Sequence, residues 1–193
     1  MDRPWTSSPL TGASPRWYWP VTTWPLSPPC RTACAGVGGL VTHLLATGRR
    51  RLALVSGPRW LAAAWAPLSA CTRLVGAAGA PPRVAAGDFT RARGRAAAQR
   101  VLLRWPDTDA IVAVGDAAAI GVLDALAARG IRVPDDVAVT GFDDVPLASA
   151  LRPALSTATH PVERIAVAAA RAALGDRAQA RLFGSRPVLR QTT

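Results

Sequence analysis

Short apolar runs alternate with stretches of helical spacing along most of the chain. Five runs are expected to be strands, because they are too short for helices and are bounded by Gly, Pro or Asp. They lie at residues 51–55, 84–86, 109–114, 137–140 and 187–190. Helical spacing predicts helices at residues 41–47, 59–77, 90–104, 117–129 and 161–174, the second of them interrupted at Pro67.

This alternation of strand and helix predicts the fold class. Strands that are apolar on both faces and separated by helices favour a parallel sheet covered on both sides, so we expect an α/β, doubly wound fold. The helix predicted from Pro161 to Leu174 carries apolar residues on overlapping faces and is expected to pack on a partner surface.

Residues 1–35 differ from the rest of the chain. They hold four of the seven tryptophans and seven of the seventeen prolines, and Asp2 is their only acid. No apolar period of two or 3.6 residues survives these prolines. We therefore predict an irregular Pro/Trp-rich leader at 1–35 and a regular domain at 36–193, with an interaction arm as the alternative for the leader.

Composition and charge narrow the class of protein. Half of the 193 residues are hydrophobic and 18% are charged, which excludes wholesale disorder. No apolar stretch reaches the length of a membrane span, and the start lacks the layout of a signal peptide, so a cytoplasmic location is expected. The net charge of +11 comes entirely from arginine, with no lysine. Nucleic-acid binding is one interpretation, and arginine-rich coding composition is the other.

Acidic side chains follow two of the predicted strands. Asp116 comes after the run at 109–114, and Asp143 after the run at 137–140. Parallel strands end at the same edge of a sheet, so both carboxylates should lie on one cleft rim. They could accept hydrogen bonds from the vicinal hydroxyls of a sugar, with Phe142 as an apolar wall. The alternative is that Asp143 or Asp144 only caps the next turn.

Other chemistry has little support in the sequence. Three cysteines and two histidines do not make a metal site, and a Gly-rich phosphate loop, a nucleophile elbow or a metal cluster is not recognisable. We therefore expect no metal and no cofactor. An enzyme that uses Asp116 and Asp143 as an acid/base pair remains an alternative, although nothing else supports catalysis.

The segment ARGIRVPDDVAVTGFDDVP at residues 128–146 closely resembles the effector-binding part of the LacI/GalR family of bacterial transcription regulators. Flanking pieces agree with that family in order and spacing. They are Gly39–Arg51 with His43-Leu44-Leu45, Val55-Ser56-Gly57-Pro58, Asp109–Gly121, Pro153-Ala154-Leu155-Ser156-Thr157 and Pro161-Val162-Glu163. The resemblance covers residues 36–193.

The resemblance implies a type I periplasmic-binding-protein-like fold, with two lobes around a sugar-sized cleft. Residues 36–156 would form most of the second lobe, and residues 157–193 would return to a partial first lobe. The family's helix-turn-helix is not recognisable in residues 1–35. The implied function is the sensor part of a repressor, a homodimer that binds a sugar or polyol and reaches operator DNA only through a helix-turn-helix outside this chain. The alternatives are a solute-binding protein of the same fold and a non-functional fragment.

Binding positions carry over from the resemblance one by one. Asp143, beside Phe142, matches an effector contact of the family. Asp116 matches the acid of an Asn-Asp pair whose Asn is replaced here by Gly115. His160 stands where the family often has Gln and is expected to face the cleft, or else to cap the helix that follows.

One family feature is missing. An arginine that binds sugar hydroxyls is usual about seven residues beyond the position of Pro58, and that place is near Trp65 here. Arg59 lies too early to replace it.

Overall fold

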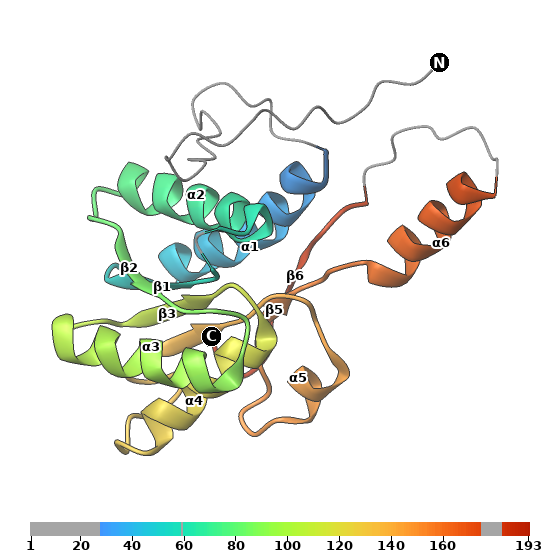
Figure 1. Ribbon diagram of the computed structural model, residues 1–193. Coiled ribbons are helices and arrows are strands. Elements are labelled where there is room, and N and C mark those ends of the chain that lie inside the picture. The colour runs from blue at the N-terminus through green and yellow to red at the C-terminus, as the bar shows by residue number, and fades with distance from the viewer. Residues whose placement is uncertain (1–27, 59, 175–182) are drawn as a thin grey trace, which may run out of the picture.

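The computed structural model describes residues 28–58, 60–174 and 183–193 (Figure 1). Its helices are α1 (Pro28–Ala46), α2 (Ala62–Ala77), α3 (Arg91–Arg104), α4 (Asp116–Ala127), α5 (Pro146–Ala150) and α6 (Val162–Ala173). Its strands are β1 (Leu52–Ser56), β2 (Arg83–Ala86), β3 (Ala110–Ala113), β4 (Ala138–Thr140), β5 (Thr157–Ala158) and β6 (Pro187–Val188).

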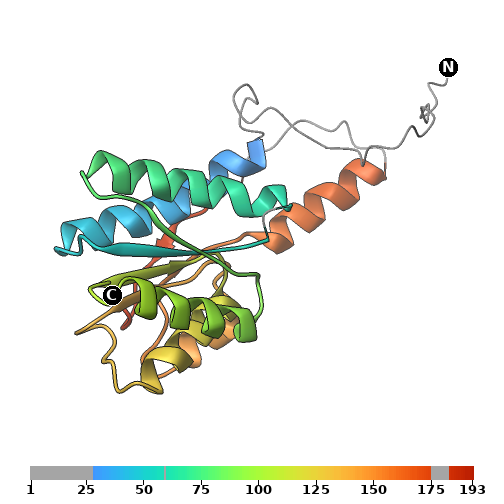
Figure 2. The same cartoon turned by 60° about the vertical axis from the view of Figure 1, so that its left-hand side comes forward.

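Strands β1 to β4 form a parallel sheet in the order β2-β1-β3-β4, and β5 pairs with β6 antiparallel. Alternate side chains of one strand enter two different cores. Ala53 and Val55 pack with α3 and α4, whereas Leu52 and Leu54 pack with α1 and α2. Figures 1 and 2 show the sheet between these two helical layers. The predicted α/β, doubly wound parallel sheet is confirmed.

Helices α3 and α4 approach each other closely through glycine. A Cβ atom built on Gly121 of α4 would lie 1.9 Å from the carbonyl oxygen of Arg91, and one built on Gly94 of α3 would lie 2.1 Å from that of Ala118. Real Cβ atoms do not approach backbone oxygens this closely. The two glycines therefore permit backbone-to-backbone packing of the pair that covers one face of the sheet.

Some element boundaries differ from the sequence predictions. Helix α1 begins at Pro28, well before the predicted start at residue 41, because prolines fit the first turn of a helix, where backbone N–H groups have no partner within the helix. Pro67 lies inside an uninterrupted α2. Helix α5 and strand β5 were not predicted, since elements of five and two residues have too little periodicity to detect.

Helix α6 extends away from the two helical layers in both views (Figures 1 and 2). Its large apolar side chains are exposed in the described part of the chain, Val162 by 57%, Ile165 by 39% and Val167 by 52%. The partner surface expected for this helix is therefore not supplied by the elements described. Of the described helices, none is long and apolar enough to cross a membrane.

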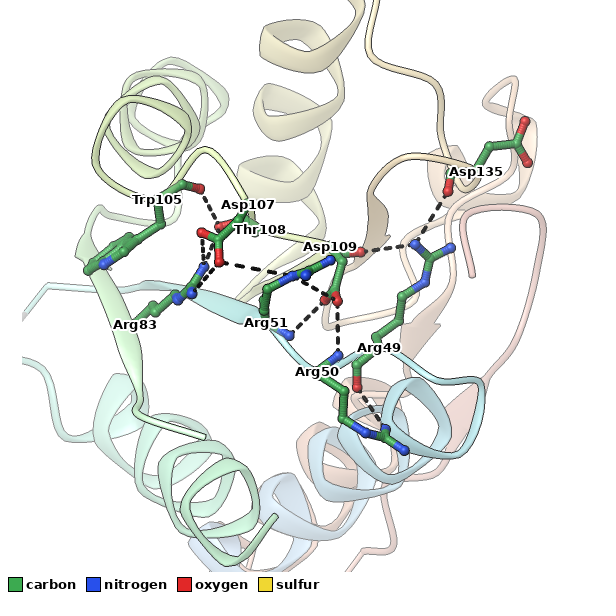
Figure 3. A network of polar contacts seen from close by, with 9 residues as sticks. All are labelled: Arg49, Arg50, Arg51, Arg83, Trp105, Asp107, Thr108, Asp109 and Asp135. Carbon is green, nitrogen blue, oxygen red and sulfur yellow. Dashed lines mark hydrogen bonds and ion pairs between the residues drawn. The ribbon is translucent and has the colours of Figure 1, made fainter. Parts of the chain in front are cut away.

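The amino ends of the strands are held by the polar network of Figure 3. Asp109, just before β3, accepts hydrogen bonds from the backbone N–H groups of Arg50 and Arg51 at 3.0 and 2.9 Å. The guanidinium of Arg49 donates to the carbonyl oxygens of Asp109 at 3.3 Å and Pro134 at 2.6 Å. These bonds join β1 to β3 and to the loop before β4. The polar groups at the amino ends of the strands are therefore used in hydrogen bonds within the protein.

Several arginines also pair with acids of the fold. Arg83 of β2 makes two hydrogen bonds of 2.8 Å with the carboxylate of Asp107. Arg91 of α3 does the same with Asp124 of α4, at 2.6 and 2.8 Å. Part of the positive charge is therefore paired with carboxylates of the same molecule. This favours a structural interpretation of these arginines over a nucleic-acid surface.

Candidate functional site

The carboxyl ends of the parallel strands bring the predicted acids together. Asp116 begins α4 directly after β3, and Asp143 follows β4, the strand that pairs with β3. A Cβ atom built on Gly115 would lie 3.5 Å from Oδ2 of Asp143, and one built on Gly141 would lie 2.2 Å from Oδ1 of Asp116. The prediction that the two acids share one edge of the sheet is confirmed.

Asp116 is fully buried, and both of its carboxylate oxygens accept hydrogen bonds from the protein. The hydroxyl of Thr157 in β5 donates to Oδ1 at 2.6 Å, and the backbone N–H of Val145 donates to Oδ2 at 2.9 Å. Burial raises the pKa of Asp116 to about 6, although these two hydrogen bonds oppose the shift. Asp116 therefore ties β5 and the start of α5 to the carboxyl edge.

The turn after β4 has an unusual backbone. Asp143 and Asp144 have φ angles of 116° and 58°, which non-glycine residues seldom adopt. Gly141 gives this turn room, since any side chain at 141 would meet Asp116. Arg190 holds Asp144 through an ion pair of 2.6 Å and donates to the carbonyl oxygen of Leu155 at 2.8 Å. Such a conformation persists only where surrounding contacts fix it.

Asp143 and His160 face each other across the edge. Nδ1 of His160 lies 3.3 Å from Oδ1 of Asp143, and the side chains are 44% and 40% exposed, respectively. Burial raises the pKa of the Asp143 carboxyl above its ordinary value, and the contact with His160 lowers it by less. The backbone N–H groups of both residues also bond across the edge, from Asp143 to Ala158 at 2.9 Å and from His160 to Asp143 at 3.2 Å.

Phe142 lies beneath this pair. Only 7% of the residue is exposed, and it belongs to the core that packs on α1 and α2. Its ring centroid is 5.6 Å from that of His160. Phe142 therefore supports the imidazole from the core side and offers little free surface of its own.

Phe89 was not predicted as a site residue. It follows β2 and is 36% exposed. Its Cδ1 would lie 3.6 Å from a Cβ atom built on Gly115, the same point that lies 3.5 Å from Oδ2 of Asp143. The signal in the sequence was an aromatic residue just after a third strand of the parallel sheet. Asp143, His160 and Phe89 thus place a carboxylate, an imidazole and an exposed aromatic ring on one edge.

Two further sequence expectations concern the place of the family's arginine and a possible metal site. The side chain of Trp65, in the place of the family's arginine, lies outside the described residues, as does Arg59. Among the described residues, there is no group of three or more His, Cys, Asp or Glu side chains that could hold a metal ion.

Comparison with protein families gives a match over residues 41–193 to the periplasmic binding protein-like domain. A curated relative is the HTH-type transcriptional regulator CelR of Thermobifida fusca, 38% identical over 124 residues. Those residues are 63% of this chain and 36% of CelR. The chain thus spans about a third of the length of that relative.

Solved structures give the same picture. A sugar-binding transcriptional regulator of the LacI family from Escherichia coli, in complex with phosphate, superposes with a TM-score of 0.77 at 26% identity, covering 84% of this chain and 61% of that one. A complex of the transcriptional regulator CelR with cellobiose superposes with a TM-score of 0.74 at 29% identity, covering 86% and 53%.

Proposed function

Because the chain belongs to the periplasmic binding protein-like family and is similar to LacI-family regulators in sequence and structure, we propose that it is the effector-sensing part of such a regulator. The effector is a small sugar or polyol, bound at the carboxyl edge of the parallel sheet. The observation that carries this proposal is the placement of Asp143, His160 and Phe89 together on that edge.

Each of these side chains has a role that its chemistry supports. The Asp143 carboxylate accepts hydrogen bonds from two neighbouring hydroxyls of the effector, because its two charged oxygens can each take one donor. His160 orients that carboxylate and offers its second ring nitrogen to the ligand. Phe89 presents an aromatic face to the apolar face of the sugar ring. The other two candidate residues stabilise this edge without contacting the ligand. Phe142 packs in the core, and Asp116 accepts hydrogen bonds from the protein.

The regulatory mechanism belongs to a complete regulator, and the chain matches 36% of the length of the relative CelR. Effector binding favours one arrangement of a homodimer and so changes the affinity of a DNA-binding domain for its operator. In this proposal the protein works in the cytoplasm. Sequence-specific contact with operator DNA comes from a helix-turn-helix and not from the domain described.

The burial of Asp116 bears on the alternative function as an enzyme. An acid/base pair needs two groups within reach of a bound substrate. Asp116 is fully buried, and both of its oxygens are engaged by Thr157 and Val145. Sensing is therefore the function that the geometry supports, and the similar proteins are transcriptional regulators.

Asp143→Ala is expected to weaken sugar binding about tenfold to hundredfold. The variant loses a charge-assisted pair of hydrogen bonds, typically about 1.5–3 kcal/mol. Calorimetric titration of the full chain with glucose, cellobiose and lactose measures the effect. Asp135→Ala is the matched control, because its carboxylate is 65% exposed and lies in the loop before β4, at the other edge of the sheet. Equal affinities in wild type and Asp143→Ala would remove Asp143 from the binding site.

A further inference from the structure

A cavity of about 350 Å³ opens between the carboxyl ends of β1 and β2 and helix α2. It is lined by Ser56, Gly57, Pro58, Ala64, Leu68, Val84 and Ala86. An apolar cavity of about 150 Å³ is enough to admit benzene in a protein core. This cavity therefore has room for an aromatic ring or a branched alkyl group.

Phe89 connects the cavity to the candidate sugar site. On one side, its Cζ would lie 2.9 Å from a Cβ atom built on Gly57, which lines the cavity. On the other side, its Cδ1 would lie 3.6 Å from a Cβ atom built on Gly115, next to the carboxylate of Asp143. The ring of Phe89 thus lies between Gly57 of the cavity lining and the carboxylate of Asp143.

The lining of the cavity defines what it can hold. Apart from Ser56, the lining residues that the structure describes have apolar side chains or none. The Ser56 hydroxyl is 3.5 Å from the carbonyl oxygen of Ala85, a weak hydrogen bond that leaves it able to bond a ligand atom. Val84 is 38% exposed on this face. A sugar hydroxyl placed here would lose its water without gaining enough partners, whereas an apolar group would gain burial.

We infer that this cavity receives an apolar substituent of the effector, so that the natural ligand is an aryl or alkyl glycoside or a similar two-part molecule. The inference rests on the proposed sugar site and adds the chemical class of its ligand. The polar part binds at Asp143 and His160, and the apolar part lies beyond Phe89 against Val84 and Ala86.

The test compares each of glucose, cellobiose and lactose with its phenyl β-glycoside, by calorimetric titration of the full chain. The phenyl glycoside of the sugar that binds is expected to bind about tenfold to hundredfold more tightly than the free sugar, because the ring leaves water. Ala86→Leu fills the cavity and should abolish that gain while leaving the affinity for the free sugar unchanged. Val84→Phe fills it from two residues earlier on the same strand, since Val84 also lines the cavity. Both positions are exposed on an edge strand, so folding should tolerate the change.

The control is Ala78→Leu, at an exposed alanine just after the end of α2 that does not line the cavity, and this variant should retain the gain. No difference between free sugar and phenyl glycoside, or a gain that survives in both cavity variants, would overturn the inference and leave the sugar site standing. A gain that is lost in the cavity variants but is insensitive to Asp143→Ala would instead overturn the proposed sugar site. Failure of every ligand to bind would contradict both.

Discussion

Gly121→Ala and Gly94→Ala are each expected to destabilise the protein by about 3 kcal/mol or more. In both cases the new methyl group would meet a backbone carbonyl of the facing helix, at 1.9 Å from Arg91 and 2.1 Å from Ala118. A backbone oxygen cannot rotate away as a side chain does, so α3 and α4 must separate. Overpacking of this kind costs from about 1 to 3 kcal/mol and occasionally more. The free energy of unfolding in urea measures the effect.

Gly76→Ala is the matched control. Gly76 lies near the end of α2, and a Cβ atom built there has no neighbour within 4 Å. Alanine is the better helix former, so this variant should gain up to about 1 kcal/mol. If Gly121→Ala unfolded at the same urea concentration as Gly76→Ala, the close approach of α3 and α4 would be wrong.

The stability of the protein is expected to fall between pH 4 and pH 7 because of Asp116. The pKa of this carboxyl is about 6 in the folded protein against an ordinary 3.8. The folded state therefore holds a proton that the unfolded state has released. The stabilisation is complete below pH 3.8 and is lost as the pH rises through 6, in total about 3 kcal/mol for a shift of about two pH units.

Asp116→Asn isolates this contribution, because asparagine does not titrate. The free energy of unfolding of the wild type should decline by about 3 kcal/mol more than that of Asp116→Asn over this interval. Asp136 serves as an internal check at lower pH, because it titrates in both proteins. Its hydrogen bonds with Arg132 lower its pKa to about 2. Parallel stability curves for wild type and Asp116→Asn would mean that Asp116 titrates normally in the folded protein.

The parallel sheet could be predicted because each strand leaves a local signal. The run from Ala110 to Ala113 is buried on both faces, and such a run between helices is typical of a covered parallel strand. The shared edge of Asp116 and Asp143 followed from that geometry alone. The family resemblance then added His160, whose Nδ1 lies 3.3 Å from the carboxylate of Asp143.

The roles of individual side chains could not be predicted in the same way. Asp116 is buried because Thr157, 41 residues along the chain, folds back onto it, and no local pattern reports such a contact. Phe89 reaches the site because β2 is the neighbour of β1, whereas in the sequence it is one residue of a loop. The arginines at the amino ends of the strands contributed only their charge to the sequence analysis. The ion pairs of Arg83 with Asp107 and of Arg51 with Asp109 depend on tertiary structure.

Mapping a bound sugar onto the two edges of the sheet tests the central claim most directly. The ¹⁵N-labelled full chain is titrated with cellobiose, lactose or glucose, and amide shifts are followed by NMR. Sugar binding at the carboxyl edge predicts saturable shifts at Gly115, Asp143 and His160, with Arg50 and Arg51 of the amino edge unchanged. Shifts concentrated at the amino edge, or no saturable shift with any of these sugars, would contradict the account.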